Sequence, residues 1–164
     1  MILELKKISK KNFEKYGQLI STKNMSSKEI NNNTTSSFYD LVDIEISGDN
    51  LQARVNIFKT KKRNFPLNID MLENHPFCSQ AFIPLQKTEF IVVVAPISKI
   101  PNKNLIEAFI IPPEEGINFK SKVWHFPLIA TEDSNFLTID KKDQSNNLEI
   151  FNFQNNEQII LNYD

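Results

Sequence analysis

The sequence is poor in the glycine that phosphate-binding loops require and in the cysteine that disulfide frameworks require. It also lacks the long apolar runs of membrane spans. It has three glycines and one cysteine among 164 residues. Gly17, Gly48 and Gly116 are too scattered to form a glycine-rich phosphate loop, which excludes the usual nucleotide cradles. The lone cysteine, Cys78, is expected to be a small buried hydrophobic residue. A membrane-spanning helix needs a run of about 18 apolar residues, and no run in this sequence approaches that length. We therefore expect a cytoplasmic protein with no membrane partner.

The chain also lacks an excess of charge of either sign. Its 19 Lys and Arg side chains are matched by 20 Asp and Glu, a formal net charge of −1, which does not indicate a polyanionic partner. The densest basic run is KTKKR, Lys59 to Arg63. A nucleic-acid surface would be a wider basic face with interleaved aromatic residues. We expect a solvated loop at this run and no nucleic-acid partner.

The N-terminal part predicts one short helix followed by a loop. Phe13, Tyr16 and Ile20 recur at helical spacing after Ser9, a residue suited to capping a helix, and Gly17 weakens the helix end. Residues 21–37 are polar and low in complexity, so they predict a long surface loop. Residues 68–74 predict one or two helical turns.

From residue 41 onward the apolar residues alternate as they do in strands. The strands predicted at residues 41–46 and 51–58 would each bury their apolar face, which holds Val42, Ile44 and Ile46 in the first and Leu51, Ala53, Val55 and Ile57 in the second. Residues 90–97 are apolar on both faces and predict a central strand. Further strands are predicted at residues 80–85, 105–113, 123–130, 136–140, 148–153 and 158–163. This spacing favours a single all-β domain over residues 1–164, a sandwich or a barrel.

Both histidines of the chain lie in segments that suit a small-molecule site. His75 precedes a proline at a turn before the strand that carries Gln80, and His125 adjoins the only tryptophan, Trp124. With Asn118 and Lys120 nearby in sequence, the second segment offers a cation for a carboxylate and an imidazole that can move a proton, which suits a small hydroxy or keto acid. The alternative is that each histidine is a packed residue with one satisfied nitrogen.

Taken together, these segments resemble the ureidoglycolate lyase family. The resemblance is carried by Glu73, His75 and Pro76, then by SQAFIPL, FIVVVA, GINF, VWHFPL and NFLTIDK in that order. It extends to an early YG pair and to an asparagine-rich loop before YDL, and so covers nearly the whole chain.

The resemblance implies a cupin-like β-barrel, that is, a double-stranded β-helix or jelly roll, paired into a homodimer. It implies a lyase that splits ureidoglycolate into glyoxylate and urea by acid–base catalysis. The catalytic residues implied are His125 and His75, and the substrate-binding residues implied are Gln80, Lys120, Asn118, Trp124 and Tyr39. We expect no tightly held metal, because a set made of His75, Gln80 and His125 would include glutamine, a poor ligand. A third good ligand would have to come from Glu73, Glu89 or Asp140.

Several positions depart from the family pattern where a site is expected. They are Ser37, Tyr39, Phe119, Phe126 and Lys141, which replace an arginine, a histidine, a tyrosine, a histidine and an arginine. Two interpretations stay open. In one, the reaction is retained and a lysine such as Lys59, Lys120 or Lys141 anchors the substrate. In the other, the chain is a non-catalytic or substrate-shifted cupin that binds a small carboxylic acid.

Overall fold

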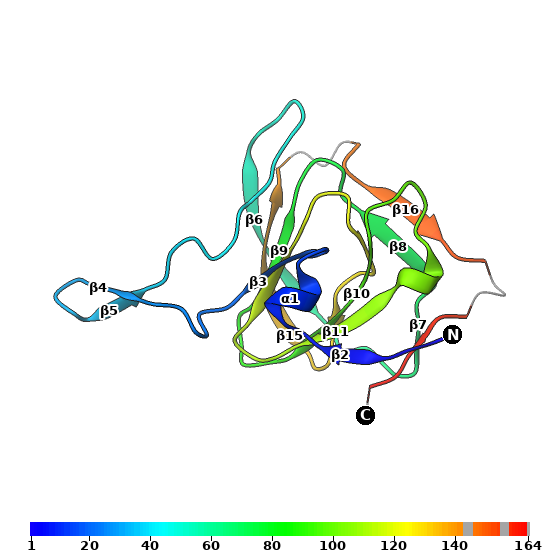
Figure 1. The fold of residues 1–164 in the computed structure, drawn as a ribbon, viewed down its shortest axis with the longest axis horizontal. Coiled ribbons are helices and arrows are strands. Elements are labelled where there is room, and N and C mark those ends of the chain that lie inside the picture. The colour runs from blue at the N-terminus through cyan, green and yellow to red at the C-terminus, as the bar shows by residue number, and fades with distance from the viewer. Residues whose placement is uncertain (143–145, 155–157, 164) are drawn as a thin grey trace.

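A computed structural model of the chain describes residues 1–142, 146–154 and 158–163, and strands dominate it (Figure 1). The one α-helix in this part of the chain is α1, Lys10–Phe13. Ser9 caps it, since its hydroxyl accepts a hydrogen bond from the Asn12 backbone N–H and the Asn12 side chain accepts one from the Ser9 N–H. The expected cap is therefore confirmed, but the helix ends before Gly17, which begins a strand. A short 3-10 turn, η1, covers Lys103–Leu105.

Two larger sheets face each other, as expected for an all-β barrel. The first has the strand order β3 (Gly17–Ile20), β12 (Gly116–Phe119), β9 (Gln80–Pro84), β15 (Ser134–Lys141) and β6 (Ala53–Thr60). The second has the order β16 (Glu149–Asn152), β8 (Met71–Asn74), β13 (Trp124–His125), β10 (Phe90–Ala95), β11 (Glu107–Ile111) and β2 (Leu5–Lys7), with β14 (Ile129–Ala130) also paired to β10. The cupin-like all-β architecture is confirmed.

The space between these sheets holds an aromatic core. Phe90 on β10 meets Phe136 on β15 edge-on, with ring centroids 5.1 Å apart, and Phe82 on β9 contacts Phe119 on β12. Phe90 and Phe136 are fully buried, and each such side chain stabilises the fold by about 1.5–3 kcal/mol relative to an exposed position. We call this space the barrel interior.

A second core covers the other face of the β8–β13–β10–β11 sheet. A small sheet of β1 (Ile2–Leu3), β17 (Ile160–Leu161) and β7 (Leu67–Asn68) lies over it. Leu72, Trp124 and Ile129 are buried in this core. Because successive side chains of a strand point to opposite faces, Trp124 faces the second core while His125 faces the barrel interior.

The polar segment 21–37 contains a hairpin rather than only a loop. Strands β4 (Lys28–Ile30) and β5 (Thr35–Ser37) pair with each other and extend away from the barrel (Figure 1). The turn between them uses Asn31, Asn32 and Asn33, all with positive φ. Asparagine tolerates this conformation best among the non-glycine residues, which is how a glycine-poor chain makes the turn.

Three predictions about local structure are wrong, and each error reflects tertiary pairing. Residues 68–74 include the strand β8, because Glu73 pairs with His125 on one side and with Ile150 on the other. Residues 41–46 form no strand beyond a single bridge from Ile46 to Cys78.

The third error concerns β6, where the predicted burial is reversed. Val55 and Ile57 are 64% and 52% exposed, whereas Arg54 and Asn56 point to the barrel interior. The polar residues can lie inside because the neighbouring strand offers them partners: Asn56 bonds to Thr138 and Asp140, and Arg54 to Asp140. Buried polar groups are stable when they are paired.

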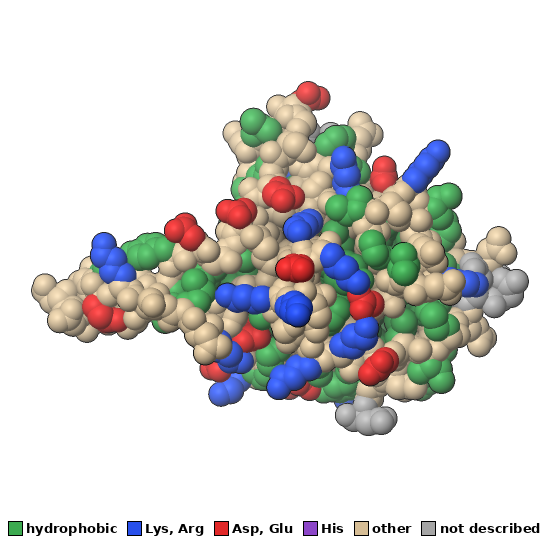
Figure 2. Space-filling view, in the orientation of Figure 1, with side chains coloured by type: hydrophobic (Ala, Val, Ile, Leu, Met, Phe, Trp, Pro, Cys, Tyr) green, Lys and Arg blue, Asp and Glu red, His purple; other side chains and the backbone are tan. Residues whose placement is uncertain are grey.

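Charges of both signs are mixed on one face of the barrel. Figure 2 shows Lys and Arg side chains interspersed with Asp and Glu over one face. The KTKKR run lies at the end of β6 and in the exposed loop after it, and Lys61 pairs with Asp133 at 2.7 Å. In the described part of the chain, no helix is long and apolar enough to cross a membrane.

Candidate active site

The two histidines come together at one end of the barrel interior, although fifty positions separate them. His125 on β13 pairs with Glu73 on β8 and with Val94 on β10, so all three side chains share the inner face. His75 follows β8 by one residue. The two imidazole centroids are 5.4 Å apart. The structure thus brings the two sequence segments into one site.

Glu73 completes a compact group with the two histidines. Its Oε1 lies 3.8 Å from the Nε2 of His125, and one ligand atom from each of Glu73, His75 and His125 lies within 4.8 Å of the others. His125 is buried, while Glu73 and His75 are partly exposed. We call these three residues the histidine centre.

Hydrogen bonds to backbone carbonyls fix both imidazole rings. The Nδ1 of His125 lies 2.9 Å from the carbonyl oxygen of Val123, and the Nδ1 of His75 lies 2.8 Å from that of Asn147. A carbonyl only accepts, so each Nδ1 carries a hydrogen and each neutral ring keeps its lone pair on Nε2. Both Nε2 atoms are buried and have no partner within the described structure. Two buried acceptors without partners indicate a ligand that donates to them, or a cation.

Burial controls the protonation of His125 and Glu73. Desolvation, with a further contribution from the neighbouring His75, lowers the pKa of His125 to about 3, against the opposing effect of the hydrogen bond that its ring donates to the Val123 carbonyl. Burial also raises the pKa of Glu73, and the nearby His75 partly offsets that rise. His125 is therefore neutral at pH 7, and its Nε2 lone pair can accept a hydrogen bond.

Phe119 forms one wall of the site. Its ring stacks on His125 with centroids 4.5 Å apart and an interplanar angle of 17°. Gln80 lies opposite Phe119 in the β9–β12 pair and shares its inner face with Phe82, as the alternation of side chains along a strand requires. The phenylalanine replaces the tyrosine of the family pattern, so the wall keeps its aromatic surface but loses a hydroxyl.

Four of the five implied substrate-binding residues lie elsewhere: Trp124, Lys120, Asn118 and Tyr39. Trp124 donates from its indole N–H to the Ser98 carbonyl and packs in the second core. The Lys120 ammonium donates to the Glu14 carbonyl at 2.6 Å on the exposed side. Asn118 is on the face of β12 opposite to Phe119, where it donates to the carbonyl of Asp43.

The remaining departures from the family pattern also lie outside the histidine centre. Tyr39 is 57% exposed beside the β4–β5 hairpin, which ends at Ser37. Phe126 is buried in the second core, so it does not seal the histidines. Lys141 donates to the carbonyl of Asn50 under the segment that precedes β6.

Asn147 is a residue of the site that sequence reasoning missed. Its carbonyl receives the His75 N–H, its side-chain oxygen accepts from the Phe77 N–H at 2.8 Å, and its amide nitrogen lies 3.2 Å from the Cys78 sulfur. It is fully buried. An asparagine in a polar stretch, 72 positions from the histidine, gives no local signal of this role.

The histidine centre has the composition of a divalent-metal site. Two imidazole nitrogens and one carboxylate suit zinc and similar ions, and each histidine donates its other N–H to a carbonyl, as metal-binding histidines do. The third member is Glu73 and not Gln80. The sequence-based expectation of no tightly held metal stays a prediction, but the poor ligand that motivated it is not part of the convergent group.

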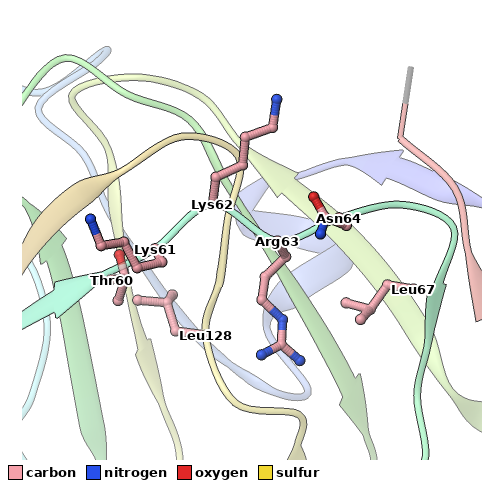
Figure 3. Close-up of a pocket in the computed structure, with 7 residues that line it drawn as sticks. All are labelled: Thr60, Lys61, Lys62, Arg63, Asn64, Leu67 and Leu128. Carbon is pink, nitrogen blue, oxygen red and sulfur yellow. The ribbon is translucent and has the colours of Figure 1, made fainter.

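A surface pocket of about 540 Å³ lies apart from this centre (Figure 3). It is lined by Thr60, Lys61, Lys62, Arg63, Asn64, Leu67 and Leu128. Its lining contains no residue of the histidine centre, and its Lys61 is already paired with Asp133. We therefore assign the candidate site to the histidines and not to this pocket.

Comparisons with known proteins agree with the motifs. The sequence model of the ureidoglycolate lyase family matches residues 1–160. A ureidoglycolate lyase of Pseudomonas fluorescens is 35% identical over 160 residues, which cover 97% of this chain and 96% of the relative. One from Pseudomonas paraeruginosa is 36% identical over 97% of this chain and 95% of its own length. A match to the family over almost the whole chain shows that this protein belongs to the ureidoglycolate lyase family.

Proposed function

We propose that the protein cleaves ureidoglycolate to glyoxylate and urea at the histidine centre. The observation that carries the proposal is the pair of buried, unpartnered Nε2 lone pairs on His75 and His125. The substrate bears a hydroxyl and ureido N–H groups on or next to the reacting carbon, and these are hydrogen-bond donors. The site therefore offers acceptors where the substrate offers donors.

The reaction requires a base that can then act as an acid. Neutral His125 accepts the proton of the substrate hydroxyl at Nε2 while the carbonyl of glyoxylate forms and the carbon–nitrogen bond breaks. The electron pair of that bond goes to the urea nitrogen, which takes the proton back from His125. Glu73, at 3.8 Å, stabilises the imidazolium in between. His75 accepts a hydrogen bond from the ureido group and orients it.

A divalent cation is compatible with the same residues. Glu73, His75 and His125 would hold it, and a bound cation would polarise the substrate hydroxyl. Activity after metal removal and after metal restoration distinguishes a reaction that needs a cation from one that does not.

The test is release of urea and glyoxylate from ureidoglycolate by the purified protein, first stripped of metals with a chelator and then with Zn²⁺, Mn²⁺ or Ni²⁺ restored. Turnover by the stripped protein supports catalysis by the imidazoles alone. Turnover only after restoration assigns a cation to Glu73, His75 and His125. If neither preparation releases products, the lyase proposal fails, and the alternative of a cupin that binds a small carboxylic acid without cleaving it is favoured.

We also propose a homodimer formed through the outer face of β6 and β15. Val55 and Ile57 are exposed on β6, and they lie opposite Ile139 and Leu137 on β15. Strand β6 ends its sheet, and a long edge strand with an apolar outer face associates with another chain unless it is covered. A second copy offers the same face, as two-fold symmetry requires.

Replacing Ile57 with lysine is expected to convert the dimer into a monomer, because it places a charge within the apolar interface. Light scattering coupled to size exclusion measures the mass. Ile97→Lys is the matched control, since Ile97 is 53% exposed against 52% for Ile57 but lies outside this face. Equal masses for the two variants and the wild type would contradict the assignment of the interface.

A cytoplasmic location is part of this proposal. Cys78 is a buried free thiol, which suits a reducing compartment.

A further inference from the structure

The substrate is an anion, but the structure gives the histidine centre no lysine. Lys120 and Lys141 donate to the carbonyls of Glu14 and Asn50, and Lys59 is exposed on β6. A carboxylate that enters this site needs a cation from another part of the barrel.

Arg54 is the guanidinium that points into the barrel interior at the level of the histidines. On β6 and β15, Arg54 pairs with Asp140. The register of β15 with β9 places Asp140 opposite Gln80, because Ile139 pairs with Ala81. Gln80 in turn pairs with Phe119, whose ring stacks on His125. One row of inward side chains therefore runs from Arg54 to the histidine centre.

Asp140 holds the guanidinium of Arg54 in place but does not occupy all of its N–H donors. Its Nε lies 2.7 Å from Asp140 Oδ1, and its Nη2 lies 3.4 Å from Oδ2. Asp140 is nearly fully buried, whereas the Arg54 side chain is 38% exposed. A guanidinium has five N–H donors, so the exposed edge keeps donors for a second carboxylate. The buried Asp140 carboxylate fixes the plane of the guanidinium group.

The ion pair with Asp140 also keeps Arg54 charged. The hydrogen bond to Asp140 raises the pKa of Arg54 above its ordinary value, although desolvation acts in the opposite direction.

We propose that Arg54 binds the carboxylate of the substrate, with Asp140 as the residue that positions its guanidinium. This inference rests on the proposed lyase function, and it assigns to Arg54 the anchoring role that the departures at Ser37 and Lys141 leave open. The selectivity that follows is for α-carboxylate ureides over neutral ureides.

The experiment compares two probes that differ only in the carboxylate. Oxalurate is a ureide with an α-carboxylate and no hydroxyl-bearing carbon to cleave, and acetylurea carries a methyl group in place of that carboxylate. Their dissociation constants are measured by calorimetry for the wild type, Arg54→Lys and Arg54→Gln, alongside KM and kcat for ureidoglycolate. Lys61→Gln is the matched control, because it removes a cation that is also paired with an aspartate, at the far end of β6.

The wild type and Lys61→Gln are expected to prefer oxalurate over acetylurea. Arg54→Gln is expected to lose about 10- to 100-fold in oxalurate affinity and to raise KM by a similar factor, the effect of losing a charge-assisted hydrogen bond. Its acetylurea affinity should not change. The oxalurate affinity of Arg54→Lys should fall between those of the wild type and Arg54→Gln. Lysine keeps the positive charge but not the planar set of N–H donors of a guanidinium.

The outcomes separate this inference from the proposed reaction. If the wild type cleaves ureidoglycolate but Arg54→Gln keeps the wild-type KM and probe preference, Arg54 is only a structural partner of Asp140 and the inference is overturned. If the wild type cleaves nothing but prefers oxalurate through Arg54, the anion site stands and the lyase reaction fails. A variant that weakens both probes equally has lost structure and not recognition, which also counts against the inference.

Discussion

Replacing His125 with alanine is expected to lower kcat for ureidoglycolate cleavage by about 10²- to 10⁴-fold, the usual contribution of a positioned acid–base residue. The reason is that Nε2 of His125 is a buried acceptor with no partner, 3.8 Å from Glu73. The measurement is the initial rate of urea and glyoxylate formation at saturating substrate. KM should change less, because the lost interaction is with the proton that is transferred in the transition state.

The control must separate lost chemistry from lost stability, because His125 is buried. Ile129→Ala truncates a fully buried side chain in the second core and is expected to cost about 2–5 kcal/mol of stability. It should leave kcat near that of the wild type at a temperature where the variant is folded. If His125→Ala also kept kcat within a few-fold, the histidine would be a packing residue.

Stability is expected to fall when the pH is lowered from about 7 to 5. Burial, then the neighbouring His75, lowers the pKa of His125 from 6.5 to about 3 in the folded protein. Below pH 6.5 the unfolded chain therefore binds a proton that the folded chain excludes, and the stabilising effect of neutral His125 is lost as the pH falls. The loss is about 1.4 kcal/mol per pH unit, or about 2 kcal/mol at pH 5.

Two carboxyl groups limit the pH range of this test. The raised pKa of Glu73, caused by burial, acts in the opposite direction just above 4.5, because its folded form binds the proton more tightly. Although burial of Glu107 opposes it, hydrogen bonds from Lys15, Lys6 and Tyr16 lower the pKa of Glu107 to about 2, so its contribution is lost only below 4.5. Urea unfolding at pH 7, 6 and 5 isolates His125. The dependence of the unfolding free energy on pH should disappear in His125→Asn. An unchanged dependence in that variant would assign the acid sensitivity to another group.

The sequence predicted the pairing of the two histidine segments better than it predicted the strands around them. Motif order identified His75 and His125, because the family resemblance covers both positions, whereas Glu73 was only one of three candidates for a third ligand. The sequence predicted that the apolar face of β6 is buried, whereas the polar face points inward. Alternation shows that the two faces of a strand differ, but it does not show which face has polar partners. Arg54 can point inward only because Asp140, 86 positions later, receives it.

Adjacency in sequence does not show which side chains share a face of a strand. Trp124 adjoins His125 but points to the opposite core, as adjacent residues of a strand must. Asn118 and Phe119 are separated in the same way, and it is Phe119 that reaches the histidine. Asn147 could not be found at all, since its role depends on a carbonyl that meets His75 only in the folded chain.

The barrel interior has an aromatic end and a polar end on the same strands, and this bears on how such a protein can evolve. On β15, Phe136 packs against Phe90, whereas Asp140, four residues later, belongs to the row that faces the histidines. Substitutions of the polar residues in that row therefore leave the contact between Phe90 and Phe136 intact. The departure at Phe119 fits the same division of labour, because a phenylalanine in place of a tyrosine loses a hydroxyl but keeps the ring that contacts Phe82.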